Sequence, residues 1–202
     1  MEMTRRGFFG SVAAAGALSV VGGCRTVSAP VPEAADGKKP AFKFGMAGYT
    51  MMKYKVDDML AVLKKVDIHY LCVKNFHLPF TATDAEMVAF KEKCAAVNVV
   101  PYAIGPIYMK TEEEARKAFE FAKRFGVKTV VGVPYEPTDE KDSWDKRKGS
   151  RKLLLFIEKL VKEFDIRYAI HNHGPASPEM FPSVACGWDL IHDLDPRIGF
   201  CM

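Results

Sequence analysis

The chain has 202 residues and a formal net charge of +4 at pH 7, with 29 Lys and Arg against 25 Asp and Glu. Hydrophobic residues make up 49% of the chain, enough for the buried core of one ordinary domain. The charge is slight, and the sequence has no basic stripe interleaved with aromatic residues, so a nucleic-acid partner is disfavoured.

The N-terminus has the features of an export signal. Residues 4–9, Thr-Arg-Arg-Gly-Phe-Phe, resemble the twin-arginine motif, and a short Ala-rich apolar run follows from residue 10 to 21. A membrane-spanning helix needs roughly twenty apolar residues, so this run is too short to serve as a permanent anchor. We therefore predict a twin-arginine signal over residues 1–24 and a location in the periplasm or cell envelope.

Two cleavage sites are compatible with this signal. Residues 21–24, Val-Gly-Gly-Cys, resemble a lipobox, which would leave a lipid anchor on Cys24 as the protein's attachment to a membrane. The alternative is an ordinary signal-peptidase site near residues 27–29. Residues 25–40 are rich in Ala, Pro, Lys and Glu without apolar periodicity, so we interpret them as a disordered tether before a folded domain over residues 41–202.

From residue 41 onward, strand-like apolar runs alternate with helical patterns. The predicted strands cover residues 42–47, 68–73, 99–104, 129–133, 168–170 and 198–201. Apolar residues recur at helical spacing in the segments 56–66, 87–97, 115–122, 153–164 and 188–192. Residues 83–86 and 111–114 have the form of capping boxes, and Gly126 is placed to end a helix. The polar stretch 136–149 is predicted to be a long loop.

This alternation predicts a parallel sheet with right-handed crossovers. A dinucleotide-binding sheet would place G-x-G-x-x-G after its first strand, and residues 46–49, Met-Ala-Gly-Tyr, lack that pattern. We therefore predict an α/β fold of the parallel (β/α) TIM-barrel type. Because a complete barrel takes about 250 residues, we expect an incomplete one, with about six of the eight βα units and strands seven and eight missing. We interpret the chain as a C-terminally truncated form.

Two histidines lie close together at the end of the fifth predicted strand. Side chains alternate along a strand, so His171 and His173 can point to the same face, at the end where barrel enzymes carry their active sites. The alternative is that both rings bind backbone groups in the turn at Gly174 and Pro175. The remaining cysteines of the domain lie among apolar neighbours without a CxxC pair and are predicted to be buried free thiols: Cys72, Cys94, Cys186 and Cys201.

Four segments carry a family resemblance. They are residues 74–79 (Lys-Asn-Phe-His-Leu-Pro), 131–134 (Val-Gly-Val-Pro), 170–175 (Ile-His-Asn-His-Gly-Pro) and 195–201 (Asp-Pro-Arg-Ile-Gly-Phe-Cys). In this order they resemble the sugar phosphate isomerase/epimerase family of xylose-isomerase-like barrels, which includes exported members with twin-arginine leaders. The resemblance implies proton transfer next to a sugar carbonyl, assisted by a divalent metal.

The resemblance also implies roles for individual residues. His171 matches a metal-ligand position that is often Glu, and an imidazole suits Zn, Mn, Fe or Co better than Mg. His173, His77 and Glu136 are the candidate catalytic residues. His77 would contact a sugar hydroxyl or carry a proton, and Glu136 would bind the sugar or a ligand imidazole. The alternatives are a surface histidine in a turn and a carboxylate that only opens a charged loop.

Three other residues are assigned to structure. His69 lies at the start of its strand, His192 lies in the fifth helix, and Trp188 is expected to pack in the core rather than to stack on a sugar.

The function expected from these observations is a metal-dependent sugar or sugar-phosphate isomerase or epimerase with a small-molecule sugar substrate. Because two histidine ligands leave most of the coordination to water, the 202-residue chain alone is expected to be nearly inactive. The alternatives are a lyase acting on keto-sugar glycosides and a non-catalytic carbohydrate-binding barrel. Cleavage of abasic DNA, known on related barrels, is disfavoured by the export signal and the weak charge.

Overall fold

The computed structural model describes residues 42–134, 143–172 and 184–201. The predicted signal, the tether, His173 and Glu136 lie outside these ranges. Among the helices within them, none is both long and apolar enough to cross a membrane.

The described chain alternates strands and helices throughout. The strands are β1 (Gly45–Ala47), β2 (Tyr70–Val73), β3 (Val100–Met109), β4 (Thr129–Pro134), β5 (Arg167–His171) and β6 (Ile198–Cys201). A 3₁₀ turn (Gly48–Met51) follows β1, and the helices are α1 (Val56–Lys65), α2 (Asp84–Ala96), α3 (Glu112–Phe125), α4 (Ser143–Phe164) and α5 (Val184–Ile191).

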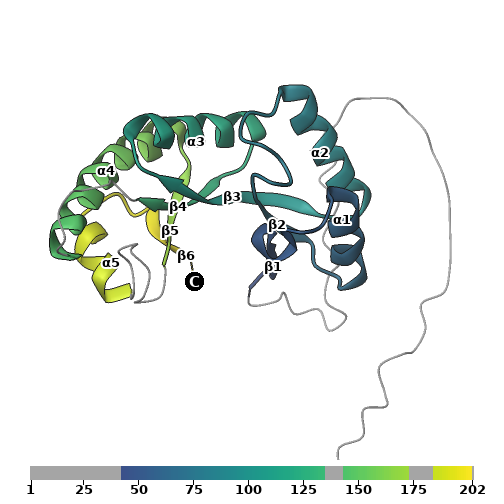
Figure 1. The fold of residues 1–202 in the computed structure, drawn as a ribbon, viewed down its shortest axis with the longest axis horizontal. Coiled ribbons are helices and arrows are strands. Elements are labelled where there is room, and N and C mark those ends of the chain that lie inside the picture. The colour runs from purple at the N-terminus through teal and green to yellow at the C-terminus, as the bar shows by residue number, and fades with distance from the viewer. Residues whose placement is uncertain (1–41, 135–142, 173–183, 202) are drawn as a thin grey trace, which may run out of the picture.

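The six strands form one parallel sheet in the order β1-β2-β3-β4-β5-β6. Figure 1 shows the α-helices α1 to α5 following one another along an arc on one side of this sheet, while the short 3₁₀ turn after β1 lies toward the open side. Strands in chain order with an outer layer of helices are the arrangement of a β/α barrel. The predicted partial barrel is therefore confirmed.

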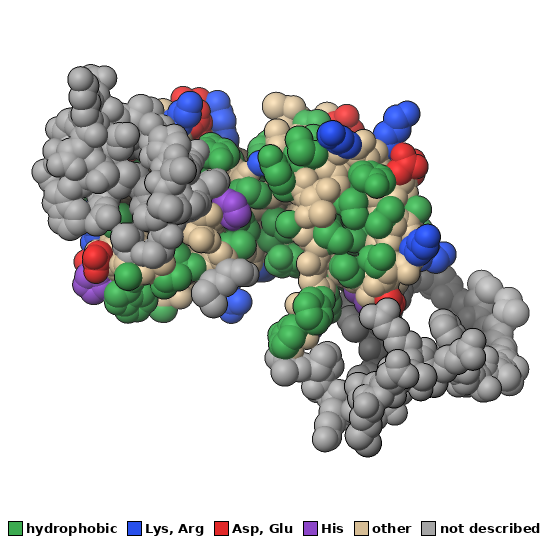
Figure 2. All heavy atoms as spheres, turned by 60° about the horizontal axis from the view of Figure 1, so that its bottom comes forward, with side chains coloured by type: hydrophobic (Ala, Val, Ile, Leu, Met, Phe, Trp, Pro, Cys, Tyr) green, Lys and Arg blue, Asp and Glu red, His purple; other side chains and the backbone are tan. Residues whose placement is uncertain are grey.

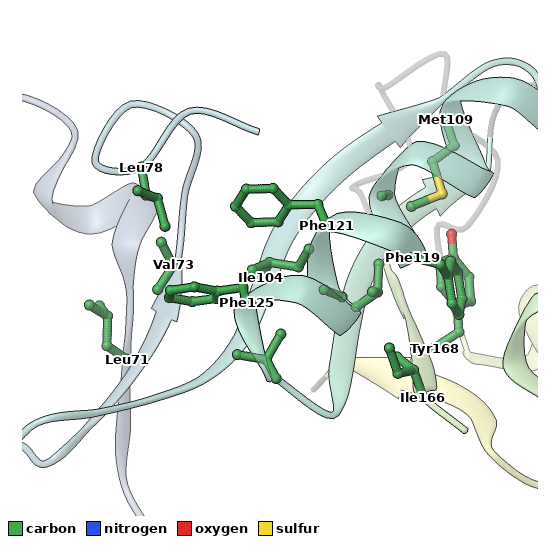
Figure 3. Close-up of a cluster of buried hydrophobic side chains, with 14 of the residues drawn as sticks. Leu71, Val73, Leu78, Ile104, Met109, Phe119, Phe121, Phe125, Ile166 and Tyr168 are labelled. Carbon is green, nitrogen blue, oxygen red and sulfur yellow. The ribbon is translucent and has the colours of Figure 1, made fainter. Parts of the chain in front are cut away.

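The main core lies between the sheet and the helices (Figure 3). Phe119 and Phe121 of α3 are buried against the sheet, where Ile104 and Tyr168 are also fully buried. The rings of Phe119 and Tyr168 stack with their centroids 6.3 Å apart. Aromatic side chains contribute large buried areas, so this contact holds the third helix against the fifth strand.

A second, smaller cluster lies on the inner face, the face of the sheet opposite the main core. Cys72, Ala103 and Val131 are buried there, and Ala169 and Cys201 pack against them. These five residues come from the neighbouring strands β2 to β6. Small side chains keep this layer thin.

The prediction of free thiols is confirmed for Cys72 and Cys94, which are buried, and Cys201 is free and half-buried.

Local signals account for several helix ends. The Thr83 side chain accepts a hydrogen bond from the Glu86 backbone, and the Glu86 carboxylate accepts one from the Thr83 backbone, so the first capping box is confirmed. Gly126 ends α3 with a φ of 82°, as predicted. The second box is only half formed. The Thr111 side chain accepts from the Glu114 backbone, but the Glu114 carboxylate accepts from the backbone of Lys110 instead.

Three sequence predictions about local structure were wrong. Helix α4 begins at Ser143, so the second half of the predicted loop is helical. Strand β3 continues to Met109 past Gly105 and Pro106, with a register shift between Ile104 and Ile107 that accommodates them. Trp188 is 56% exposed rather than in the core, because its position on α5 faces away from the sheet.

Candidate functional site

The candidate site is the inner face at the C-terminal ends of the strands, where barrel enzymes place their chemistry. Figure 2 looks onto this open side. Hydrophobic and uncharged side chains fill its middle, and charged side chains lie mainly toward its margins. One residue of the family motifs and one predicted site residue lie at this end of the sheet. Lys74 directly follows β2, and His171 is the last residue of β5, half-buried and in register with Cys201 of β6.

Lys74 and Cys72 both bind the backbone of β3. The Lys74 ammonium donates a hydrogen bond to the Pro106 carbonyl, and the Cys72 thiol donates to the Gly105 carbonyl at 3.6 Å. Burial lowers the pKa of Lys74 from its usual value, partly offset by the Cys72 thiol. Burial also raises the pKa of Cys72 to about 12, with a smaller contribution from Cys201. Cys72 is therefore a protonated thiol at neutral pH.

The backbone at Gly105 allows this arrangement. Its φ of +129° lies in a region that favours glycine, and a Cβ there would collide with the Val131 carbonyl on β4. The close approach of β3 to β4 thus fixes where the Gly105 and Pro106 carbonyls lie, and those carbonyls in turn orient Cys72 and Lys74.

His77 is buried, at 6% exposure, in the turn that follows β2. Its Nε2 donates a hydrogen bond to the Met51 carbonyl at 3.0 Å, and its backbone N–H donates to the Lys74 carbonyl at 3.0 Å. Burial lowers the pKa of His77, which favours the neutral ring. The imidazole therefore joins the turn carrying Lys74 to the turn that follows β1. A direct catalytic role for His77 stays a prediction.

A cavity of about 250 Å³ adjoins His77, and its other walls include Phe90 and Lys93 of α2. This cavity opens among the helices rather than on the inner face. A larger open pocket of about 580 Å³ lies at the opposite ends of the strands, where Thr129 and Arg167 begin β4 and β5. In β/α barrels that end serves stability rather than catalysis.

The remaining predicted site residues are not brought together by the described chain. His173 and Glu136 lie outside it, so their predicted roles stay predictions. Across the ranges that the structure describes, no three His, Cys, Asp or Glu side chains are grouped so that they could hold a metal ion. His171 is the one predicted ligand within these ranges, and the described residues do not by themselves complete a metal site.

His69 and His192 contact neighbouring structural groups rather than the candidate site. The His69 Nδ1 lies 2.9 Å from the Asn98 carbonyl, and its Nε2 lies 3.0 Å from the Asp67 carboxylate. The His192 Nδ1 lies 3.1 Å from the Trp188 carbonyl. These contacts agree with the structural roles that the sequence suggested. Lys74 had no predicted role, although it opens the first segment of the family resemblance.

No family pattern matches the chain, and neither does any curated protein sequence. Solved structures do match. D-psicose 3-epimerase from Clostridium cellulolyticum H10, crystallised with D-tagatose, is 12% identical with a TM-score of 0.61, covering 78% of this chain and 62% of the epimerase. The IOLI protein, with a bound zinc atom, is 14% identical with a TM-score of 0.62, covering 79% and 62%. A sugar phosphate isomerase/epimerase from Parabacteroides distasonis ATCC 8503 is 13% identical with a TM-score of 0.56, covering 85% and 68%.

The chain thus spans about 62% of the length of most of these matched structures. At such low sequence identity the likeness concerns the fold. Six parallel strands in chain order, with helices on their outer side, give this chain part of the β/α barrel found in xylose-isomerase-like sugar isomerases and epimerases.

Proposed function

We propose that the chain carries the larger part of a sugar isomerase or epimerase barrel that transfers a proton next to a sugar carbonyl. The observation that supports this most is the placement of Lys74 and His171 on one open face, at the C-terminal ends of β2 and β5. The fold likeness to an epimerase crystallised with D-tagatose supports a sugar as the ligand of that face.

Roles for individual residues follow from their positions. His171 would be a ligand of a divalent metal, and its imidazole suits Zn, Mn, Fe or Co. When bound, such a metal supplies polarisation of the sugar carbonyl. His173 and Glu136 are proposed to move protons and to bind sugar hydroxyls. His77 is proposed to position the turn that carries Lys74, because its backbone and ring bind the two neighbouring turns.

Deuterium exchange tests this function even when turnover is slow. The chain is incubated with a ketose and Zn²⁺ or Mn²⁺ in D₂O, and exchange next to the carbonyl is followed by NMR. We expect slow metal-dependent exchange that His171→Gln abolishes, while His192→Gln, which changes an exposed histidine just after α5, has no effect. Sugar binding without exchange would contradict the enzyme and favour a non-catalytic carbohydrate-binding barrel.

A lyase would give a different product. Isomerases and such lyases both begin by removing a proton next to a carbonyl. The one predicted metal ligand in the described ranges does not distinguish between them. Incubation with an oxidised disaccharide separates them, because only a lyase releases the second sugar. Release at a rate above that of ketose exchange would replace the isomerase proposal.

We further propose that residues 1–24 direct export to the periplasm or cell envelope by the twin-arginine route. A reporter fused to residues 1–40 should be exported, and changing Arg5 and Arg6 to Lys should stop it. If Cys24 is lipidated, Cys24→Ala should release the reporter from membranes. Export that is unaffected by the arginine changes would contradict the proposed route.

A further inference from the structure

Lys74 carries a positive charge into the inner face, and no described carboxylate lies beside it to balance that charge. The side chain is half-buried, and its ammonium donates to the Pro106 carbonyl. The charged or titratable group that acts on it is the Cys72 thiol, which burial keeps protonated. Within residues 42–134, 143–172 and 184–201, no carboxylate forms an ion pair with Lys74.

This situation is unusual for a lysine. Lysines are rarely buried without a paired anion, because removing an ammonium group from water is costly unless an opposite charge or several hydrogen bonds replace the lost water. One carbonyl occupies one of the three N–H donors of Lys74, and the described residues provide no hydrogen-bond acceptor for the other two. Several other described lysines instead form ion pairs on the outer surface, such as Lys93 with Asp57 and Lys117 with Glu113.

The direction of Lys74 is also held in place. The turn from Lys74 to His77 is closed by a backbone hydrogen bond, and the His77 ring binds the Met51 carbonyl. At the other end, the Pro106 carbonyl holds the ammonium group. A lysine that is fixed at both ends loses little further freedom when it binds a ligand, which favours a role in recognition.

We propose that Lys74 binds an anionic oxygen group of the sugar ligand, a phosphate or a carboxylate, and so selects charged sugars over neutral ones. This rests on the proposed function, because it places a sugar on the same inner face. Lysine binds phosphate and carboxylate as a point charge, and such charge-assisted hydrogen bonds are stronger than neutral ones. The neighbouring Ala103 and Val131 side chains are apolar and Cys72 offers only a weakly polar thiol, so the anion's main partner on this part of the face is Lys74.

Calorimetric titration of the full chain tests whether it prefers charged sugars to neutral ones. The probes are D-fructose, D-fructose 6-phosphate, D-glucuronate and inorganic phosphate, at low and at physiological salt. We expect at least one of the two charged sugars to bind about tenfold or more tightly than D-fructose, since hydrogen bonds to charged groups have that order of effect. Comparing the phosphate with the carboxylate sugar identifies which anion the site takes.

Two substitutions remove the charge in different ways. Lys74→Gln keeps a polar end, and Lys74→Met keeps an apolar stem, so at least one should fold with the helical signal of the parent chain. Each should lose the preference for the charged sugar, whereas Lys74→Arg should retain it in part. The matched control is Lys128→Gln, directly before β4 at the opposite end of the sheet, where Lys128 pairs with Asp165.

The outcomes separate this inference from the proposed function. Equal binding of charged and neutral sugars, or a preference that survives Lys74→Gln and Lys74→Met, would overturn the role of Lys74 while proton exchange on a neutral ketose could still be found. A preference that depends on Lys74 without any proton exchange would support the anion site and contradict the isomerase. If no sugar and no phosphate bound, both proposals would be wrong.

Discussion

The ring of Tyr168 on β5 lies directly against the backbone of Gly132 on β4. A methyl group on Gly132 would come 2.7 Å from the Tyr168 hydroxyl oxygen and 2.8 Å from its ring. Gly132 pairs with Ile170 of β5, and Tyr168 lies two residues before Ile170 on the same face of the sheet. The Tyr168 ring therefore extends along the strand to cover Gly132. The glycine therefore makes room for the largest fully buried side chain of the core.

Gly132→Ala should destabilise the fold by about 1–3 kcal/mol, because the ring of Tyr168 is wedged between Gly132 and Phe119 and cannot move away freely. The measurement is urea unfolding followed by circular dichroism. Gly199→Ala on β6 is the matched control, because a Cβ there meets no atom within 4 Å. Equal stability of the two variants would contradict the packing described here.

Tyr168→Phe should leave stability unchanged or raise it by about 1 kcal/mol. The Tyr168 hydroxyl is buried and has no hydrogen-bond partner among the described residues, so its removal loses no contact and relieves a desolvation cost. Burial also raises the pKa of this hydroxyl above its usual value. The same unfolding measurement applies, with Tyr168→Ala as the variant that loses the ring and about 3–5 kcal/mol. A clear loss of stability in Tyr168→Phe would mean that the hydroxyl has a partner.

Arg197 should make stability depend on acid pH. Its guanidinium donates to Asp195 and Asp165, and it holds the pKa of the Asp195 carboxylate below the usual value. The pKa of Asp165 is lowered by Lys128 first and by Arg197 second. A lowered folded pKa stabilises the protein above the unfolded value of about 4, and this stabilisation is lost as the pH falls through the folded pKa. Arg197→Gln should therefore destabilise the protein at pH 7, and the difference from the parent chain should shrink at pH 3.

The control for that experiment is Arg124→Gln. Arg124 pairs with Asp84 on the surface, and such exposed pairs contribute little. We expect a small effect on urea unfolding at both pH values. If Arg197→Gln behaved in the same way as Arg124→Gln, the cluster around Arg197 would have no measurable role in stability.

Metal binding by the 202-residue chain should be weak. Catalytic zinc normally keeps three protein ligands, whereas His171 is the one predicted ligand within the described ranges and His173 lies outside them. Competition with a chromophoric chelator should show weak Zn²⁺ binding that His171→Ala weakens further and His192→Ala leaves unchanged. Tight stoichiometric binding that survives His171→Ala would place the metal elsewhere.

The sequence by itself predicted the features that depend on neighbouring residues. The alternation of apolar runs and helical stripes was enough for six strands and their parallel order, because each pattern reflects the local geometry of one element. Thr83 and Gly126 marked helix ends for the same reason, since a cap acts within one turn of the chain. The placement of His171 at the end of a strand also followed from this local pattern.

Other features were decided only by contacts between distant parts of the chain. Strand β3 continues beyond Gly105 and Pro106 because its residues from Ile107 onward pair with β4, after the register shift. The local sequence does not indicate that pairing. Trp188 is exposed because α5 turns that position away from the sheet, which its apolar neighbours could not indicate. The partners of Lys74 lie 32 residues away on β3, so the environment of its charge exists only once the strands have assembled.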